Sequence, residues 1–416
     1  MKLQADTTEC AEQDRGIGPV PSANHPEQAI LRVPPGTRKL PHVFYIIDQL
    51  CQFGGAERIL LEMVRRISRE RFRCSVVTFN LDPGLEALRN LPAPLYNLPL
   101  KRVYDFNAAK MAIQLRRLIC REKVSIVHTF FETSDLWAAP VAKFSGCPIL
   151  ISSRRDMGIL RTRKHQLAYP IVNRIFDRVL AVSDEVRAHC IQHDHLSPDR
   201  VETLYNGVDI AELDVLASGG NLRQQLGLPN NSPLVSTLAN IRSIKGIDIL
   251  VRAAQHVCEK FRNVIFLVVG SVLEPQTMAD LRTQVETLQL ADNFRFVGAL
   301  ANPFPVLRTS NVFCLPSRNE GFSNALIEAM GCALPSVATR VGGNAEALKE
   351  GESGYLVASE DAEAMADRIL RLLRDPVMAR RMGEVARETV KARFSMDAMM
   401  NRLMGIYDEL LAAKNV

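Results

Sequence analysis

The chain has 416 residues, which is long enough for two domains. Of these residues 47% are hydrophobic and 23% are charged, a composition typical of proteins with ordinary hydrophobic cores. Its nine cysteines are scattered without a Cys-x2-Cys pair, which favours reduced thiols in a cytoplasmic protein over a disulfide framework or a zinc site. No apolar run reaches the length of a membrane span. Residues 1–40 are polar and rich in proline, and we expect a disordered tail there.

The net charge of +5 is unevenly distributed, because residues 1–210 hold 29 Lys and Arg against 23 Asp and Glu. This excess is either an ordinary solvated face or a surface that attracts anionic lipid or a phosphorylated acceptor, with the protein then peripheral on the cytoplasmic side of a membrane. Few aromatic residues are interleaved with it, which argues against nucleic acid. The basic residues are densest at Arg154, Arg155, Arg161, Arg163, Lys164, Arg174 and Arg178.

Strands and helices are predicted to alternate from residue 42 onward. The helix at 56–67 has an apolar face formed by Leu60, Leu61, Val64 and Ile67. Alternation of this kind predicts a parallel sheet with helices on both faces. The first strands are predicted at residues 42–47, 74–79, 124–129, 149–152 and 178–182.

The pattern restarts after a polar stretch over residues 205–232, and a strongly periodic helix is predicted over 394–413. The fold class is therefore α/β with two Rossmann-like domains, at 41–210 and 211–395, followed by a C-terminal helix at 396–416. Ligands of such sheets bind outside the carboxyl ends of the strands. The second set of strands is predicted at residues 234–238, 264–269, 294–297, 312–315 and 336–338.

Two carboxylates, Glu320 and Glu328, are separated by a glycine turn and the start of a helix. Glu320 follows a short buried strand, and Glu328 lies about one turn inside a helix that ends near Gly331. The first amides of a helix are unpaired and attract anions, whereas nearby carboxylates need partners such as sugar or ribose hydroxyls. The combination suggests a nucleotide-sugar pocket.

Glu320 and Glu328 match the E-x7-E motif of retaining glycosyltransferases of family 4, which have the GT-B fold. Residues 334–343 and Glu346 also resemble that family, and the resemblance covers about residues 41–416. It implies transfer of a hexose from a nucleotide diphosphate sugar to a lipid-linked or glycan acceptor, with retention at the anomeric carbon, in cell-surface polysaccharide biosynthesis. In the family the final helix packs back across both domains.

The resemblance also assigns roles near the donor. It places Glu320 on the transferred sugar and Glu328 on the ribose. Lys245 is expected to contact the diphosphate, and a solvated loop lysine is the alternative. Many members carry arginine five positions before this lysine, where the chain has Asn240, so its arginine, Arg242, is a less direct match. The backbone amides expected on the diphosphate follow Gly321, at Phe322, Ser323 and Asn324.

Four further features are candidates for the donor site or the acceptor side. Gly54 and Gly55 open a helix after the first strand and would allow backbone to approach a phosphate or sugar, although such pairs are common in turns. His128 ends a predicted strand and would face the transferred sugar, unless it is structural. Gly342-Gly343 would lie near the donor. Residues 152–156 follow a strand and would line the acceptor side.

Two rival functions remain from the sequence: a nucleotide-sugar epimerase or phosphorylase of similar fold, and a non-catalytic protein that binds sugar nucleotides. An epimerase would lack the full motif set, and a phosphorylase would usually be longer. The chain has no Asp-x-Asp ligand pair, so we expect no metal and no cofactor besides the donor.

Overall fold

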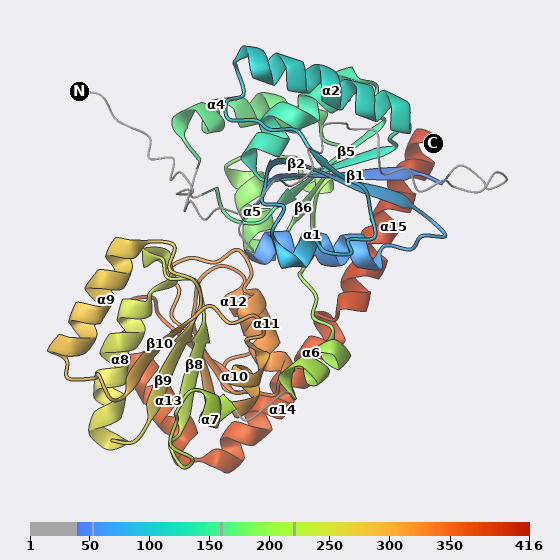
Figure 1. The fold of residues 1–416 in the computed structure, drawn as a ribbon. Helices are drawn as coiled ribbons and strands as arrows, with labels where there is room; N and C mark the ends of the chain where they lie inside the picture. The colour runs from blue at the N-terminus through green and yellow to red at the C-terminus, as the bar shows by residue number, and fades with distance from the viewer. Residues whose placement is uncertain (1–39, 52–53, 159–160, 219–221) are drawn as a thin grey trace, which may run out of the picture. The chain divides into compact units, whose positions relative to one another are not determined.

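The computed structural model describes residues 40–51, 54–158, 161–218 and 222–416, so the predicted tail falls almost wholly outside the described residues. It contains two parallel sheets with helices packed on them (Figure 1). The first sheet has the strand order β3-β2-β1-β4-β5-β6-β7 and the second β10-β9-β8-β11-β12-β13. The predicted α/β class with two Rossmann-like sheets is confirmed.

The first sheet spans most of the first half of the chain. Its strands are β1 (His42–Leu50), β2 (Arg73–Leu81), β3 (Leu95–Asn97), β4 (Ile126–Phe130), β5 (Ile149–Arg154), β6 (Arg178–Ala181) and β7 (Val201–Thr203). The helices among them are α1 (Gly55–Arg66), α2 (Phe106–Glu122), α3 (Ala139–Phe144), α4 (Arg163–Val172) and α5 (Asp184–Gln192), with short turns η1 (Glu86–Leu88), η2 (Ser134–Ala138), η3 (Asn173–Ile175) and η4 (Pro198–Arg200).

The second sheet follows two connecting helices, α6 (Ile210–Ala217) and α7 (Leu222–Gln225). Its strands are β8 (Leu234–Leu238), β9 (Ile265–Val269), β10 (Phe294–Gly298), β11 (Val312–Leu315), β12 (Ser336–Thr339) and β13 (Tyr355–Val357). The remaining helices are η5 (Ser243–Lys245), α8 (Ile247–Lys260), α9 (Pro275–Thr287), α10 (Phe304–Thr309), α11 (Asn324–Gly331), α12 (Asn344–Ala347), α13 (Ala362–Arg374), α14 (Pro376–Arg393) and α15 (Met396–Lys414).

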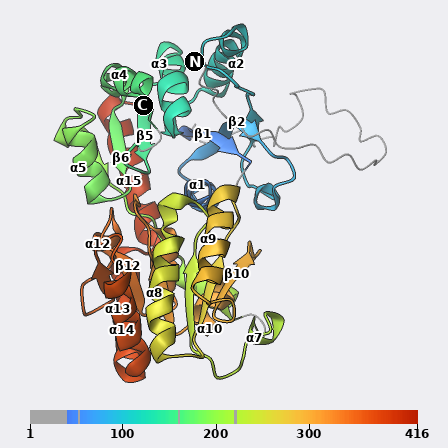
Figure 2. The same ribbon diagram turned by 90° about the vertical axis from the view of Figure 1, so that its left-hand side faces the viewer.

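Strand β1 shows how the first sheet divides its two faces, because successive side chains of a strand point to opposite sides. Phe44 and Ile46 belong to the core formed with α2 and α3. Tyr45 and Ile47 belong to the core formed with α1 and α15. The last helix thus packs on the first sheet although it follows the second in the chain. Figure 2 shows α2, α3 and α4 together on their side of this sheet.

Both sheets reverse their strand order at one point, between β1 and β4 in the first and between β8 and β11 in the second. Loops that leave the carboxyl ends of these strands are the expected ligand site of such sheets. The loops after β8 and β11 carry Lys245 and Glu320. Among the described residues, no helix combines the length and the apolar character that crossing a bilayer needs.

Candidate active site

Helix α11 begins where the sequence predicts an anion-binding terminus. Ser323 caps it, since its hydroxyl accepts a hydrogen bond of 3.3 Å from the backbone N–H of Leu326. The amides of the first turn have no acceptor within the helix and point out of its N-terminus. Glu328 lies one turn further along, as predicted.

Glu320 lies at the end of the loop after β11 and is 8% exposed. Its Oε1 accepts hydrogen bonds of 2.7 Å from Lys245 Nζ and 2.7 Å from the Ser317 hydroxyl. The loop after β8 and the loop after β11 therefore meet through one carboxylate oxygen. Ser317 was not anticipated, although it lies three residues before the first glutamate of the motif.

The Gly342-Gly343 loop lies directly against the backbone of Glu320. Gly342 has a φ of +50°, and a Cβ there would lie 1.6 Å from the carbonyl oxygen of Glu320. The Gly343 N–H donates a hydrogen bond of 3.0 Å to the Gly321 carbonyl. Position 342 therefore requires glycine for two reasons: the backbone has a positive φ there, and the backbone of Glu320 leaves no room for a Cβ.

Lys245 is positioned by the turn that follows it. Gly246 has a φ of +62° and precedes α8 as its N-cap residue, and a Cβ there would lie 2.1 Å from the Pro316 carbonyl oxygen. Arg242 starts the same turn and is exposed. The Asn240 side chain instead braces the loop, because its Oδ1 accepts a hydrogen bond of 3.0 Å from the Ser271 N–H.

Glu328 is 3% exposed and forms an ion pair with Arg58 of α1. Burial lowers the pKa of the Arg58 guanidinium, and the neighbouring carboxylates of Glu62 and Glu212 oppose that shift. The sequence offers no signal for the Arg58–Glu328 pair, because the two residues are far apart in the chain and arginine is common on helix surfaces.

The Gly54-Gly55 turn meets α11 as well. Asn324 Nδ2 donates a hydrogen bond of 3.2 Å to the Gly55 carbonyl, and a Cβ on Gly55 would lie 3.1 Å from that nitrogen. Asn324 also accepts a hydrogen bond from Asn206. The N-terminus of α1 is occupied by the Glu57 carboxylate, whose pKa is raised by burial and lowered in part by the amides of Glu57 and Gly54.

The structure does not bring His128 to these residues. It lies in the middle of β4 and is fully buried. One ring nitrogen is 2.7 Å from the Tyr407 hydroxyl of α15 and the other is 2.8 Å from the Ser153 hydroxyl. Burial lowers the pKa of His128 to about 3, so the ring is neutral. We therefore leave His128 out of the proposed catalytic group.

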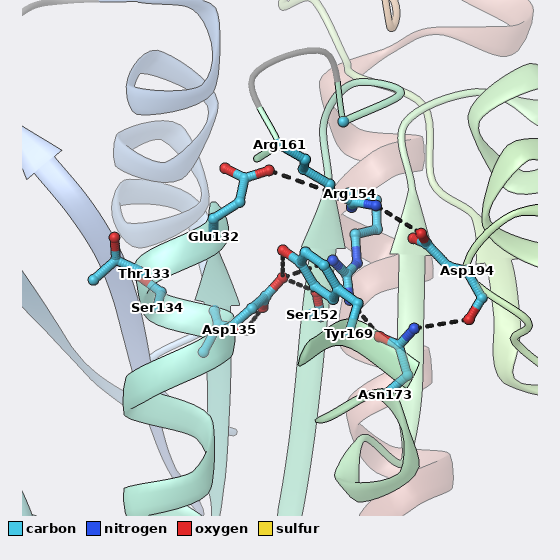
Figure 3. A network of polar contacts seen from close by, with 12 residues as sticks. Glu132, Thr133, Ser134, Asp135, Ser152, Arg154, Arg161, Tyr169, Asn173 and Asp194 are labelled. Atoms are coloured by element: carbon cyan, nitrogen blue, oxygen red, sulfur yellow. Dashed lines mark hydrogen bonds and ion pairs between the residues drawn. The ribbon is translucent and has the colours of Figure 1, made fainter. Parts of the chain in front are cut away.

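A buried polar network lies at the carboxyl ends of β4 and β5 (Figure 3). Asp135 forms an ion pair of 3.0 Å with Arg154 and accepts hydrogen bonds from the hydroxyls of Thr129 and Ser152. The ring of Tyr169 lies 4.3 Å from the guanidinium carbon of Arg154 and 4.0 Å from that of Arg161. Arg161 also pairs with Asp194 at 2.7 Å.

This network corrects the interpretation of the basic stretch. Arg154 is 3% exposed and the Arg161 side chain is 7% exposed, so neither belongs to a solvated face or to a surface that could meet lipid. Both arginines instead line a small cavity. Other residues of the segment 152–156, which we predicted to lie on the acceptor side, line the same cavity. The cavity is lined by Phe131, Glu132, Asp135, Ser153, Arg154, Arg155, Asp156, Arg161 and Tyr169.

Within the described part of the chain, no three His, Cys, Asp or Glu side chains are grouped so that they could hold a metal ion. The cation paired with Glu320 is Lys245, and Arg242 begins the same turn. Cationic side chains can stabilise a departing diphosphate. The expectation that no metal takes part stays a prediction.

Comparison with curated proteins found several similar enzymes. The chain is 29% identical over 311 residues to an N-acetyl-alpha-D-glucosaminyl L-malate synthase of Bacillus anthracis, covering 72% of this chain and 79% of that protein. It is 23% identical over 373 residues to a UDP-Gal:alpha-D-GlcNAc-diphosphoundecaprenol alpha-1,3-galactosyltransferase of Escherichia coli, covering 87% and 95%.

Solved structures match the fold. A glycosyltransferase of Rickettsia africae has a TM-score of 0.79 at 20% identity, covering 89% of this chain and 99% of that one. Anabaena Alr3699/HepE in complex with UDP-glucose has a TM-score of 0.77 at 21% identity, covering 88% and 99%.

Family models match both halves of the chain. The model for Glycosyltransferase Family 4 matches residues 53–212, and the model for Glycosyl transferases group 1 matches residues 220–389. Together with the two sheets and the similar enzymes, these matches identify the chain as a family 4 glycosyltransferase with the GT-B fold.

Proposed function

We propose that this glycosyltransferase moves a hexose from a nucleoside diphosphate sugar to a lipid-linked or glycan acceptor, with retention of anomeric configuration. The observation that carries the proposal is the meeting of Lys245 and Glu320 at the point where the second sheet reverses its strand order. The binding of UDP-glucose by the Anabaena protein of the same fold supports a nucleotide-sugar donor.

In this proposal the donor lies across the ends of β8 and β11. Lys245, and Arg242 on the same turn, neutralise the diphosphate, and the first amides of α11 donate hydrogen bonds to it. Glu320 holds hydroxyls of the transferred sugar, and Glu328 holds the ribose. The Gly342-Gly343 loop supports Glu320 from behind, while Gly54-Gly55 approaches from the first sheet.

The proposed reaction is a front-face substitution. The acceptor hydroxyl attacks the anomeric carbon from the side on which the diphosphate leaves, the bond from that carbon to the diphosphate oxygen breaks, and the β-phosphate takes the hydroxyl proton. No side-chain nucleophile is needed, so the enzyme contributes orientation and charge stabilisation. Lys245 matters most here, because negative charge grows on the leaving phosphate.

We propose that the acceptor approaches from the side of the small cavity at the carboxyl ends of β4 and β5. The E. coli relative, whose printed name specifies a diphosphoundecaprenol-linked acceptor, supports a lipid-linked substrate and a role in surface polysaccharide synthesis. The lining contains three arginines, Arg154, Arg155 and Arg161. Arg154 and Arg161 are paired with the carboxylates of Asp135 and Asp194, whereas Arg155 donates a hydrogen bond to the neutral side chain of Asn206, so Arg155 is the one we expect to meet an acceptor.

The test is an incubation with UDP-glucose, UDP-galactose and UDP-N-acetylglucosamine, with and without a bacterial lipid extract. We expect release of UDP from one donor that increases with lipid extract, and an α-linked product by proton NMR. Conversion of one nucleotide sugar into another without UDP release would support an epimerase. Binding of donor without turnover under every condition would support a non-catalytic protein.

A further inference from the structure

Helix α2 exposes a stripe in which apolar and basic side chains alternate. Phe106, Lys110, Ile113 and Arg117 lie at spacings of four, three and four, which places them on one face of the helix. All four are exposed, and Phe106 is 89% exposed. The opposite face packs into the core through Ala108, Met111, Leu115 and Ile119. The outer stripe is therefore not part of the core of the described chain.

Helix α4 and the turn after it carry a second stripe of the same composition. Arg163, Leu167, Ile171 and Arg174 follow one another at spacings of four, four and three, and all four are exposed. Leu167 is 77% exposed and Ile171 is 69% exposed. Large apolar side chains that are more than half exposed on two helices exceed the scattered apolar residues that any surface shows.

These helices are neighbours. In Figure 2, α3 lies between α4 and α2, and α3 packs against α2 and against η3. The end of α3 carries Phe144, which is 85% exposed, beside the exposed Lys143. Tyr104, just before α2, is 80% exposed. We call the two stripes together with Tyr104 and Phe144 the basic apolar surface.

The charge of these segments is strongly one-sided. Residues 101–123, 143–146 and 162–174 contain eleven Lys and Arg against two acidic residues, a net of +9. The whole chain has a net charge of +5, so the remainder of the chain is net negative. The positive surplus of the protein therefore lies on the same segments that expose aromatic and aliphatic side chains.

We propose that the basic apolar surface docks on an anionic phospholipid bilayer. Such a membrane offers a negative surface for the Lys and Arg side chains and an apolar layer for the Phe, Leu and Ile side chains between them, which is how interfacial helices bind. The residues that dock are not the buried arginines of the basic stretch: Arg154 and Arg161 take no part. The surface is also separate from the residues assigned to the donor.

Co-sedimentation of the full-length protein with vesicles tests this. We expect binding to vesicles that contain phosphatidylglycerol, little binding to pure phosphatidylcholine, and loss of binding at high salt. In a charge variant, Lys110→Gln, Arg117→Gln, Arg163→Gln and Arg174→Gln are combined. Each should lower the partition coefficient about fivefold. In an apolar variant, Phe106→Ser, Leu167→Ser and Ile171→Ser should each lower it on the order of tenfold.

The matched control combines Val377→Ser and Arg381→Gln on α14, where Val377 is 81% exposed. This variant should bind vesicles as the unmodified protein does, and all variants should keep the same circular dichroism spectrum. The proposal is overturned if the wild-type protein stays in the supernatant or binds neutral and anionic vesicles equally. It is also overturned if the α14 control loses as much vesicle binding as the surface variants do. It is also overturned if the surface variants convert a dimer to a monomer and leave vesicle binding unchanged.

Discussion

Lys245 Nζ lies 2.7 Å from Glu320 Oε1, joining the turn after β8 to the loop after β11. In our proposal the two groups bind different parts of the donor: the Lys245 ammonium binds the diphosphate, and the Glu320 carboxylate binds the sugar. The pair is only partly shielded, since the Lys245 side chain is 28% exposed. The ion pair therefore contributes little to the stability of the fold, and its main effect is to hold the two donor-binding side chains in position.

Lys245→Ala should lower the turnover number on the order of 10²-fold, because it removes a cation from the position where negative charge grows. The melting temperature should change little. UDP release under saturating donor is the measurement. Lys260→Ala at the exposed end of α8 is the control and should retain wild-type turnover. Full turnover in Lys245→Ala would contradict the role assigned to this lysine.

Gly342→Ala should abolish activity and lower the melting temperature, since the new methyl group would overlap the Glu320 carbonyl. Gly351→Ala is a matched control, because Gly351 also has a positive φ, +75°, but among the described residues other than its chain neighbours no heavy atom lies within 4 Å of its Cβ position. The control should lose only about 1–2 kcal/mol of stability. Similar effects at both positions would mean that backbone strain alone, and not contact with Glu320, makes Gly342 necessary.

Asp135→Asn should destabilise the fold by about 3–5 kcal/mol, because it leaves the buried Arg154 guanidinium without its charged partner. Asp408→Asn breaks the exposed pair with Arg71 and should cost less than about 1 kcal/mol. Denaturant unfolding of both variants measures the difference. Equal costs would show that the network is not the buried structural unit described here.

Stability should fall as the pH falls below about 6.5. Burial lowers the pKa of His128 to about 3 and that of His42 to about 4, so both stay neutral in the folded protein while the unfolded chain takes up protons. Each histidine with a lowered pKa reduces the free energy of unfolding by about 1.4 kcal/mol per pH unit below 6.5, which amounts to about 2 kcal/mol at pH 5. His128→Gln should show a shallower loss between pH 7 and pH 5 than the unmodified protein. An identical slope would contradict the assignment.

The central strands could be predicted closely from the sequence, and β8 and β11 match to the residue because their apolar runs are bounded by polar segments. The strands β3, β7 and β13 were not predicted from the sequence; each has three residues and lies at a sheet edge. Such short segments show no periodicity, and their pairing depends on a neighbour far away in the chain.

The functional site shows the same limit: residues within local motifs could be predicted, whereas contacts between residues far apart in the chain could not. Glu320, Lys245 and Gly342 belong to local motifs, and the structure brings them into contact. Arg58 could not be predicted, since its partner Glu328 is on another sheet's helix. His128 was misplaced because β4 continues to Phe130, which puts the histidine in mid-strand with its ring towards α15.

The separate roles of the two glutamates are the centre of the account. Glu328 is assigned to the ribose, which UDP and the intact donor share, so Glu328→Gln should weaken both alike. Arg58→Ala removes the charged partner of Glu328 but keeps the carboxylate, so it should weaken UDP binding less than Glu328→Gln does. Glu320 is assigned to the sugar alone, so Glu320→Gln should lower turnover and leave UDP affinity unchanged, with Lys245 still free to meet the diphosphate.

Calorimetric titration of UDP into Glu320→Gln and Glu328→Gln tests this most directly. We expect Glu328→Gln to lose affinity for UDP, whereas Glu320→Gln should bind UDP as the unmodified protein does. Loss of UDP affinity in Glu320→Gln, with wild-type affinity in Glu328→Gln, would contradict the account and reverse the orientation of the donor.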